Sequence, residues 1–106
     1  MTDYSKMTDY SKMTDEQVNE AIAKSKGYIF LEWTWVEKDS HNVAGSIDYT
    51  HDWRLCGELL EEMPNGFRLW RTKKYWICAK INSIWRKGNT PQRAICEAWL
   101  AWKEQG

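Results

Sequence analysis

Asp and Glu are absent from the long stretch between Pro64 and Cys96, which contains eight Lys or Arg residues and five aromatic residues. Because the whole chain is formally neutral, the remainder carries the opposite charge, and residues 1–62 hold thirteen Asp or Glu against six Lys or Arg. We therefore expect a molecule with one positive and one negative side. A positive surface interleaved with flat rings suits phosphates and bases, and it equally suits an acidic protein face.

Other absences narrow the class of protein. Cys56, Cys78 and Cys96 are odd in number and include no CxxC pair, which argues against a disulfide framework and for reduced, buried thiols. No apolar run approaches the length of a membrane span, and the N-terminus lacks the apolar segment of a signal peptide. No glycine-rich phosphate loop is present either. We therefore expect a cytoplasmic protein that does not contact membranes.

The first residues repeat a hexapeptide, because residues 7–12 have the same sequence as residues 1–6. This period is too short for a solenoid unit, and the segment has no periodic apolar face to bury. We expect residues 1–12 to be a disordered repeat tail. The length of the remainder fits one domain, and eight tryptophans supply it with large side chains for a core. Residues 13–106 are therefore predicted to form a single α/β/α domain.

Local signals predict a helix, a strand and a second helix before the basic stretch. A capping box at Thr14, with the apolar spacing that follows it, predicts a helix over 15–26. Aromatic and β-branched residues alternate with polar ones over 28–37, which is the pattern of a strand. A polar loop over 38–47 leads to a helix that begins at Thr50 and ends before Pro64.

The basic stretch predicts a β-hairpin followed by a last helix. The two strands cover 67–72 and 75–81, and we expect residues 84–85 to extend the second strand after a kink at 82–83. Pro91 takes the first position of the last helix. The predicted order is α-β-α-β-β-α, which indicates an α+β protein. We expect a three-layer α/β/α sandwich around a small, mainly antiparallel three-stranded sheet.

Two short motifs resemble a known family. Residues 48–53 read Asp-Tyr-Thr-His-Asp-Trp, and residues 90–98 read Thr-Pro-Gln-Arg-Ala-Ile-Cys-Glu-Ala. They are similar to the Tyr-Ser/Thr-x-Asp segment and the terminal Ala-Ile-Cys-x-Ala helix of the phage ABA-sandwich domain family, over residues 13–104. The resemblance implies a small α/β/α protein of a tailed bacteriophage or prophage, found in the cytoplasm of the bacterial host, with no catalytic residues to carry over. The chain departs from the family in having Lys-Gly-Tyr at 26–28, where Leu-Gly-Trp is common.

Residues of catalytic or metal-binding type are scattered. The two His and three Cys residues form no paired metal-binding motif, so we expect no metal site, no cofactor and no catalytic residue. A nucleophile built from Cys56 or Cys96 with His51 has no local support, because thiols on apolar helical stripes are usually small hydrophobes. Tyr49 and Asp52 are candidate ligand-binding residues, although a role at the start of the middle helix explains them as well.

The basic hairpin supplies the main candidate site. The candidate ligand-binding residues there are Arg68, Trp70, Arg71, Lys73, Lys74, Lys80, Arg86 and Lys87. Alternation places Trp70 on the face opposite to Phe67 and Leu69, which makes it the better candidate for the outer face. A face without a ligand, whose cations interact with the acidic first half, explains the same residues.

These observations favour a non-enzymatic phage or prophage accessory protein. It would bind a protein partner or a small anionic, nucleotide-like ligand. The alternative is a nucleic-acid-binding module that uses the basic aromatic hairpin 67–87, and self-association also stays open. The near-neutral net charge weighs against the alternative, because most nucleic-acid-binding domains are basic.

Overall fold

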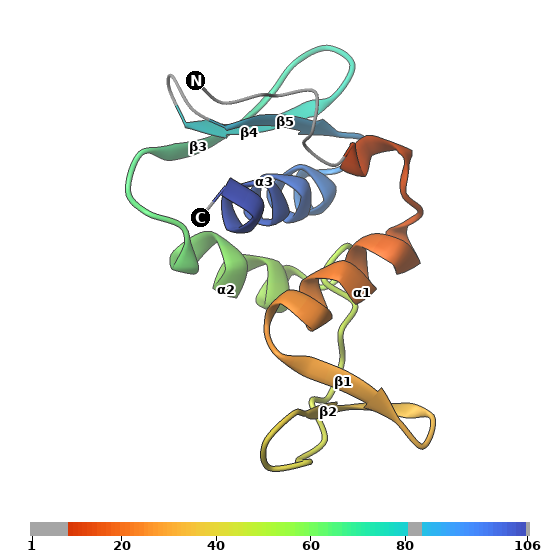
Figure 1. The fold of residues 1–106 in the computed structure, drawn as a ribbon. Helices are drawn as coiled ribbons and strands as arrows, with labels where there is room; N and C mark the ends of the chain where they lie inside the picture. The colour runs from red at the N-terminus through yellow and green to blue at the C-terminus, as the bar shows by residue number, and fades with distance from the viewer. Residues whose placement is uncertain (1–8, 81–83, 106) are drawn as a thin grey trace.

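The computed structural model describes residues 9–80 and 84–105, which form an α+β protein (Figure 1). Its helices are the single turn η2 (Tyr10–Lys12), α1 (Asp15–Ser25), α2 (Trp53–Glu62) and α3 (Pro91–Gln105). Its strands are β1 (Tyr28–Leu31), β2 (Thr34–Glu37), β3 (Phe67–Arg71), β4 (Trp76–Lys80) and β5 (Trp85–Gly88). β1 and β2 form an antiparallel hairpin, and β3, β4 and β5 form an antiparallel sheet with β4 in the centre. None of the helices in the described part of the chain is long and apolar enough to cross a membrane.

The elements stack in layers around α3 (Figure 1). The three-stranded sheet packs on one side of α3, and α1 and α2 pack on the opposite side. The β1–β2 hairpin continues beyond α1, at the end of the molecule farthest from the three-stranded sheet. The expected sandwich has helices on both faces of the sheet, whereas the helices of residues 9–80 and 84–105 all lie on one face. No helix of these described residues covers the other face of the sheet.

The prediction of one strand over 28–37 is wrong, because this segment contains two strands. Glu32 and Trp33 have φ angles of 47° and 70°, and they turn the chain back so that Leu31 pairs with Thr34. Two successive residues with positive φ form a tight hairpin turn, which usually has Asn and Gly at these positions. Glu and Trp give no such signal, so the alternation of aromatic residues conceals the turn.

The predicted extension of the second basic strand is also wrong. Trp85 lies in β5, which returns antiparallel to β4 and forms an edge of the sheet. The backbone N–H of Lys80 donates to the carbonyl of Ile84 at 2.9 Å and closes the connection. The kink expected at 82–83 lies outside the described residues. The observed order of the longer elements is therefore α-β-β-α-β-β-β-α.

Helix α3 is buried without a break from Ala94 to Ala101. A helix that is buried all round needs covering layers on opposite sides, and the sheet and the α1–α2 layer supply them. Thr90 fixes its start, because the threonine Oγ1 accepts a hydrogen bond from the backbone N–H of Arg93 at 3.1 Å. In its third turn the indole Nε1 of the fully buried Trp99 donates to Oε2 of Glu62 at 2.8 Å, which links α3 to the end of α2.

The domain begins earlier than residue 13. Tyr10 lies in η2 with 8% of its surface exposed, and it belongs to the hydrophobic core. Its hydroxyl donates to Oε2 of Glu104, near the end of α3, at 2.8 Å. One aromatic side chain thus anchors a segment that has no periodic apolar pattern. Residues 9–12 belong with the domain, and the rest of the predicted tail lies outside the described residues.

Replacing Trp99 with alanine should lower the free energy of unfolding by about 3–5 kcal/mol, because a fully buried indole leaves a cavity behind. Trp53→Ala is the matched control. Trp53 is 54% exposed, so we expect its replacement to change stability by less than about 0.5 kcal/mol. Urea denaturation followed by circular dichroism measures both variants, and equal losses would contradict the assignment of the buried face of α3.

Candidate functional site

Two rows of side chains share the sheet face that points away from α3. The cross-strand register gives the rows Arg68–Ala79–Trp85 and Trp70–Ile77–Lys87. Side chains alternate between the two faces of a strand, and the intervening residues Leu69 and Cys78 pack in or against the core under the sheet. We call the six residues of the two rows the outer sheet face.

The outer sheet face exposes two tryptophans. Trp70 is 42% exposed, which confirms the expectation from alternation, and Trp85 is 47% exposed. Ile77 and Ala79 between them are buried. Each row therefore carries an indole at one edge, a cation at the other edge and an apolar residue in the centre. Because the order is reversed between rows, the two indoles lie diagonally across the face.

The turn between β3 and β4 continues the positive surface. Its backbone is held by Thr72, whose Oγ1 accepts hydrogen bonds from the N–H groups of Lys74 (3.3 Å) and Tyr75 (3.1 Å). Lys73 and Lys74 are exposed beside it. On the adjoining edge, Nζ of Lys87 lies 4.9 Å from the ring centroid of Tyr75. A cation held over a ring in this way has a defined position.

The other predicted cations belong to the opposite face of the sheet. The guanidinium of Arg71 lies 5.9 Å from the ring centroid of Trp76, its cross-strand partner. Arg86 pairs with Cys78, and Lys80 pairs with Phe67, so both are in register with residues packed in or against the core. The predicted set of cations is therefore divided between two faces. Trp85 is not among the predicted ligand-binding residues, and the structure places it on the outer sheet face.

Tyr49 and Asp52 have structural roles. Tyr49 is 3% exposed, and burial raises the pKa of its phenol well above the ordinary value, so it presents no surface to a ligand. Asp52 caps α2, because its Oδ1 accepts a hydrogen bond from the backbone N–H of Arg54 at 2.9 Å. The middle helix therefore begins at Trp53 and not at Thr50.

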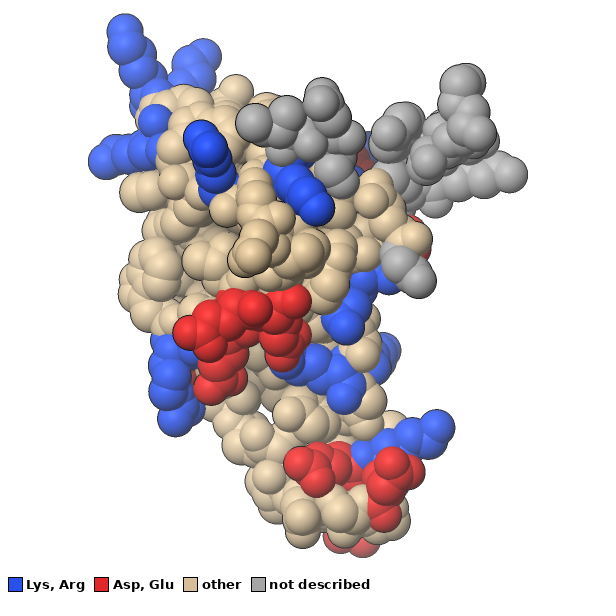
Figure 2. Space-filling view, turned by 90° about the vertical axis from the view of Figure 1, so that its left-hand side faces the viewer, with Lys and Arg blue, Asp and Glu red and all other residues tan. Residues whose placement is uncertain are grey.

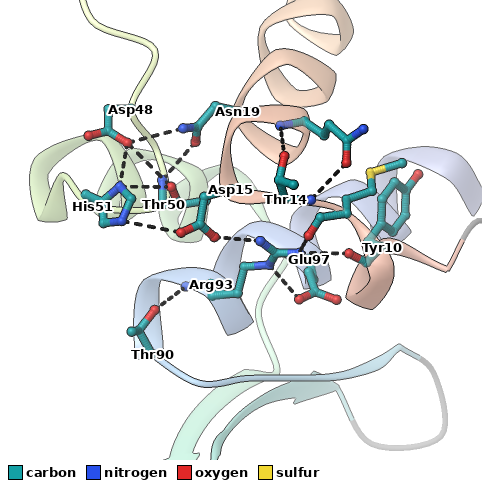
Figure 3. Close-up of polar contacts among 12 residues, drawn as sticks. Tyr10, Thr14, Asp15, Asn19, Asp48, Thr50, His51, Thr90, Arg93 and Glu97 are labelled. Atoms are coloured by element: carbon teal, nitrogen blue, oxygen red, sulfur yellow. Dashed lines mark hydrogen bonds and ion pairs between the residues drawn. The ribbon is translucent and has the colours of Figure 1, made fainter.

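Arg93 comes from the carboxylate-free stretch, but it binds carboxylates from elsewhere in the fold (Figure 3). Its Nε donates to Oε2 of Glu97 at 2.8 Å, and its Nη1 donates to Oδ1 of Asp15 at 2.6 Å. Its Nη2 donates to the carbonyls of Tyr10 (2.9 Å) and Met13 (2.6 Å). Burial raises the pKa of Glu97, and the hydrogen bond from Arg93 opposes that shift. The guanidinium thus holds the N-terminal segment on α3 and is occupied by the protein itself.

His51 extends this chain of charges toward α2 (Figure 3). Its Nδ1 lies 2.8 Å from Oδ1 of Asp48, and its Nε2 lies 3.4 Å from Oδ2 of Asp15. The hydrogen bond with Asp48 raises the pKa of His51 above its ordinary value, and the same bond lowers the pKa of Asp48. Asn19 joins the network, because its Oδ1 accepts from the backbone N–H of Thr50 at 3.0 Å. Side chains from residues 48–53 and 90–98 therefore connect α1, the segment before α2, and α3.

A hollow of about 390 Å³ lies between η2, the end of β5 and the start of α3. Its lining includes Asp15, Lys87, Arg93 and Glu97. Arg93 already binds both carboxylates, so most of the charge in the wall is neutralised internally. The hollow therefore offers an anion less than the outer sheet face does.

Positive and negative side chains are unevenly distributed along the molecule (Figure 2). On the face shown, Lys and Arg side chains predominate at the sheet end, whereas Asp and Glu side chains cluster over the helical layers and at the hairpin end, together with further Lys and Arg side chains. The sequence predicts this excess of positive charge on the sheet. An anionic ligand would meet an attractive field at the sheet end and a repulsive one at the hairpin end.

The thiols lie in the interior. Cys56, Cys78 and Cys96 are free and fully buried, and burial raises the pKa of Cys78 to about 12. Within residues 9–80 and 84–105, no group of three or more His, Cys, Asp or Glu side chains is placed to hold a metal ion. The described cysteines therefore act as packing groups.

Comparison of the chain with protein-family models, with curated proteins and with solved structures gives no match. The resemblance to the phage ABA-sandwich domain family therefore stays a prediction. The functional argument has to rest on the geometry described above.

Replacing Arg93 with leucine should lower the free energy of unfolding by about 3–5 kcal/mol, because the buried carboxylate of Glu97 loses its partner. Arg54→Leu is the matched control, since Arg54 is exposed on α2 and its loss should change stability by less than about 0.5 kcal/mol. Denaturant titration measures both. An Arg93→Leu variant as stable as the wild type would show that the N-terminal segment does not depend on the guanidinium.

The pKa of His51, measured by NMR titration, should lie above its ordinary value of 6.5 and should fall in the Asp48→Asn variant. Because the folded-state pKa is raised, the stability that His51 contributes is fully present below pH 6.5 and is lost as the pH rises through the folded-state value. Asp39→Asn, on an exposed loop, is the control. An unchanged titration curve in Asp48→Asn would contradict the hydrogen bond.

Proposed function

We propose that this protein is a non-enzymatic binding protein that holds single-stranded nucleic acid on the outer sheet face. The observation that carries the proposal is the pair of exposed indoles, Trp70 and Trp85, each in a row that ends in a cation on an open antiparallel sheet. Single-stranded nucleic acid is bound in this way elsewhere, with bases stacked on aromatic side chains and phosphates held by basic ones.

The dimensions of the face suit more than one nucleotide. Strands are about 4.8 Å apart, so residues on β3 and β5 are separated by about 10 Å across the sheet. Trp70 and Trp85 are thus far enough apart to stack two different bases. Arg68 and Lys87 lie beside them in the same face, and the turn residues Lys73 and Lys74 extend the cationic surface for the backbone.

The neutral net charge of the chain is compatible with this role. On the face shown in Figure 2, the clusters of Asp and Glu side chains lie over the helical layers and at the hairpin end. At physiological salt, charges separated by more than about 8 Å are largely screened, so a bound strand would respond mainly to the cations beside it. The same argument predicts weak, strongly salt-dependent binding.

The other hypotheses use the same protein face. A small nucleotide-like anion would need few contacts, and an acidic protein partner would need charge but no stacking of bases. A phage or prophage origin belongs to this proposal too. It rests on the motifs at 48–53 and 90–98.

Trp70→Ala and Trp85→Ala should each weaken binding of a labelled mixed-sequence single-stranded oligonucleotide by about 1–3 kcal/mol, the usual value of one stacked base. Fluorescence anisotropy at low salt measures the dissociation constants. Trp53→Ala is the control, because Trp53 is equally exposed but lies on α2. Arg68→Gln and Lys87→Gln should each lower the slope of log K against log salt concentration by about one. That is the contribution of one phosphate contact.

Three outcomes would contradict the proposal. The first is no binding of the oligonucleotide at low salt, and the second is unchanged binding in the Trp70→Ala/Trp85→Ala double variant. The third is binding of a mononucleotide as tightly as the oligonucleotide, which would favour the small-ligand hypothesis.

A further inference from the structure

The β1–β2 hairpin projects from the helical layers (Figure 1), and several of its large apolar side chains are exposed. Trp33 at the tip is 92% exposed, and Phe30 and Leu31 before it are 53% and 40% exposed. The centroid of the Phe30 ring lies 5.4 Å from that of Trp35, its partner on the neighbouring strand, so these two rings pack together across the hairpin. An exposed group of large apolar residues on a protruding element is typical of an interaction site.

The turn that displays Trp33 is unfavourable for its own residues. Glu32 and Trp33 both have positive φ, a region that side chains other than Gly and Asn seldom occupy. Asn and Gly would form the same turn without strain. Backbone strain that persists in a native fold usually marks a functional position. Here the strained turn holds the indole of Trp33 in the solvent.

The hairpin also carries negative charge. Glu32 and Glu37 lie on it and Asp39 directly follows it, against the single cation Lys38 in the segment 28–40. Figure 2 shows this excess of carboxylates at the hairpin end of the molecule. The hairpin therefore presents an indole beside carboxylates. These groups complement the indoles and cations of the outer sheet face.

We infer that the hairpin tip of one molecule docks on the outer sheet face of a second copy of the same chain. The charges of the two surfaces are complementary, and Trp33 would pack beside Trp70 or Trp85 with Glu32 near Arg68 or Lys87. The hairpin cannot reach its own sheet, because the two lie at opposite ends of a molecule that is 41 Å long. This inference shares the outer sheet face with the proposed function but does not depend on its ligand.

The contact uses different surfaces on the two copies, so it is heterologous. Such a contact leaves one free hairpin and one free sheet face on every pair, and assembly continues beyond the dimer unless a ring closes. A single strand of nucleic acid on the outer sheet face would exclude the incoming hairpin. Binding of nucleic acid and self-association are therefore expected to compete.

Two variants test the docking without unfolding either surface. Glu32→Asn/Trp33→Gly removes the indole and the carboxylate of the tip, and it installs the residues that this turn prefers. Trp70→Ala/Trp85→Ala removes the indoles of the outer sheet face. Each variant alone is expected to stay monomeric in sedimentation velocity at low salt, at concentrations where the wild type and the Trp53→Ala control form species larger than the dimer.

Mixing the two variants gives the decisive measurement. The sheet variant keeps an intact hairpin and the hairpin variant keeps an intact sheet, so the mixture should form a one-to-one heterodimer and nothing larger. Raising the salt concentration should increase the dissociation constant of this heterodimer by about tenfold or more. Salt shortens the distance over which the opposite charges of the two surfaces attract each other. A monomeric wild type, a hairpin variant that still self-associates, or a mixture without heterodimer would overturn the inference.

The oligonucleotide experiment separates this inference from the proposed function. The hairpin variant Glu32→Asn/Trp33→Gly should bind the oligonucleotide at least as tightly as the wild type, and the oligonucleotide should dissolve wild-type oligomers. If the hairpin variant binds the oligonucleotide but no chain self-associates, the inference fails and the proposed function stands. If the heterodimer forms but no oligonucleotide binds, the proposed function fails and the inference stands. Oligomers that persist with the oligonucleotide bound would overturn the inference, because the hairpin would then occupy another surface.

Discussion

Residues Ala94 to Ala101 are buried in succession, so α3 has no solvent-facing side over more than two turns. This requires a layer on each side of the helix, and the sheet and the α1–α2 pair supply these layers around one hydrophobic core. The buried Glu97 adds an electrostatic condition, because a carboxylate in this position needs a charged partner. Arg93 supplies this charge, and its other N–H groups bind Asp15 at the start of α1 and two carbonyls of the segment before it. One helix thus organises both the layers and the N-terminal boundary.

In the same arrangement, no helix of the described residues covers the outer sheet face. With the helices on one side, the two outer rows of β3, β4 and β5 need not be apolar at their edges, and the chain places two indoles and two cations there. Burial of the central Ile77 and Ala79 keeps the sheet stable under this surface. The outer sheet face and the structural network are consequently separate, since Arg93, Asp15 and His51 belong to the latter.

Short-range patterns predicted the parts of the fold that local signals encode. The capping box at Thr14 forms as expected, and alternation placed Trp70 on the outer sheet face. The turn at Glu32 was not predictable, because its residues disfavour the backbone they adopt. The contact of Arg93 with Asp15 joins residues 78 positions apart, and no local pattern reports a partner at that distance. For the same reason, the prediction from the sequence treated cations that are close in the chain as one site, whereas the strand register places them on two faces of the sheet.

The contacts of residues 9–13 show that the end of the duplicated hexapeptide packs on α3. Arg93 and Glu104 touch Tyr10 and Met13, and deletion of either copy of the repeat leaves the same residues before Met13. A gene that loses or gains one copy by replication slippage would therefore still encode the segment that docks on α3.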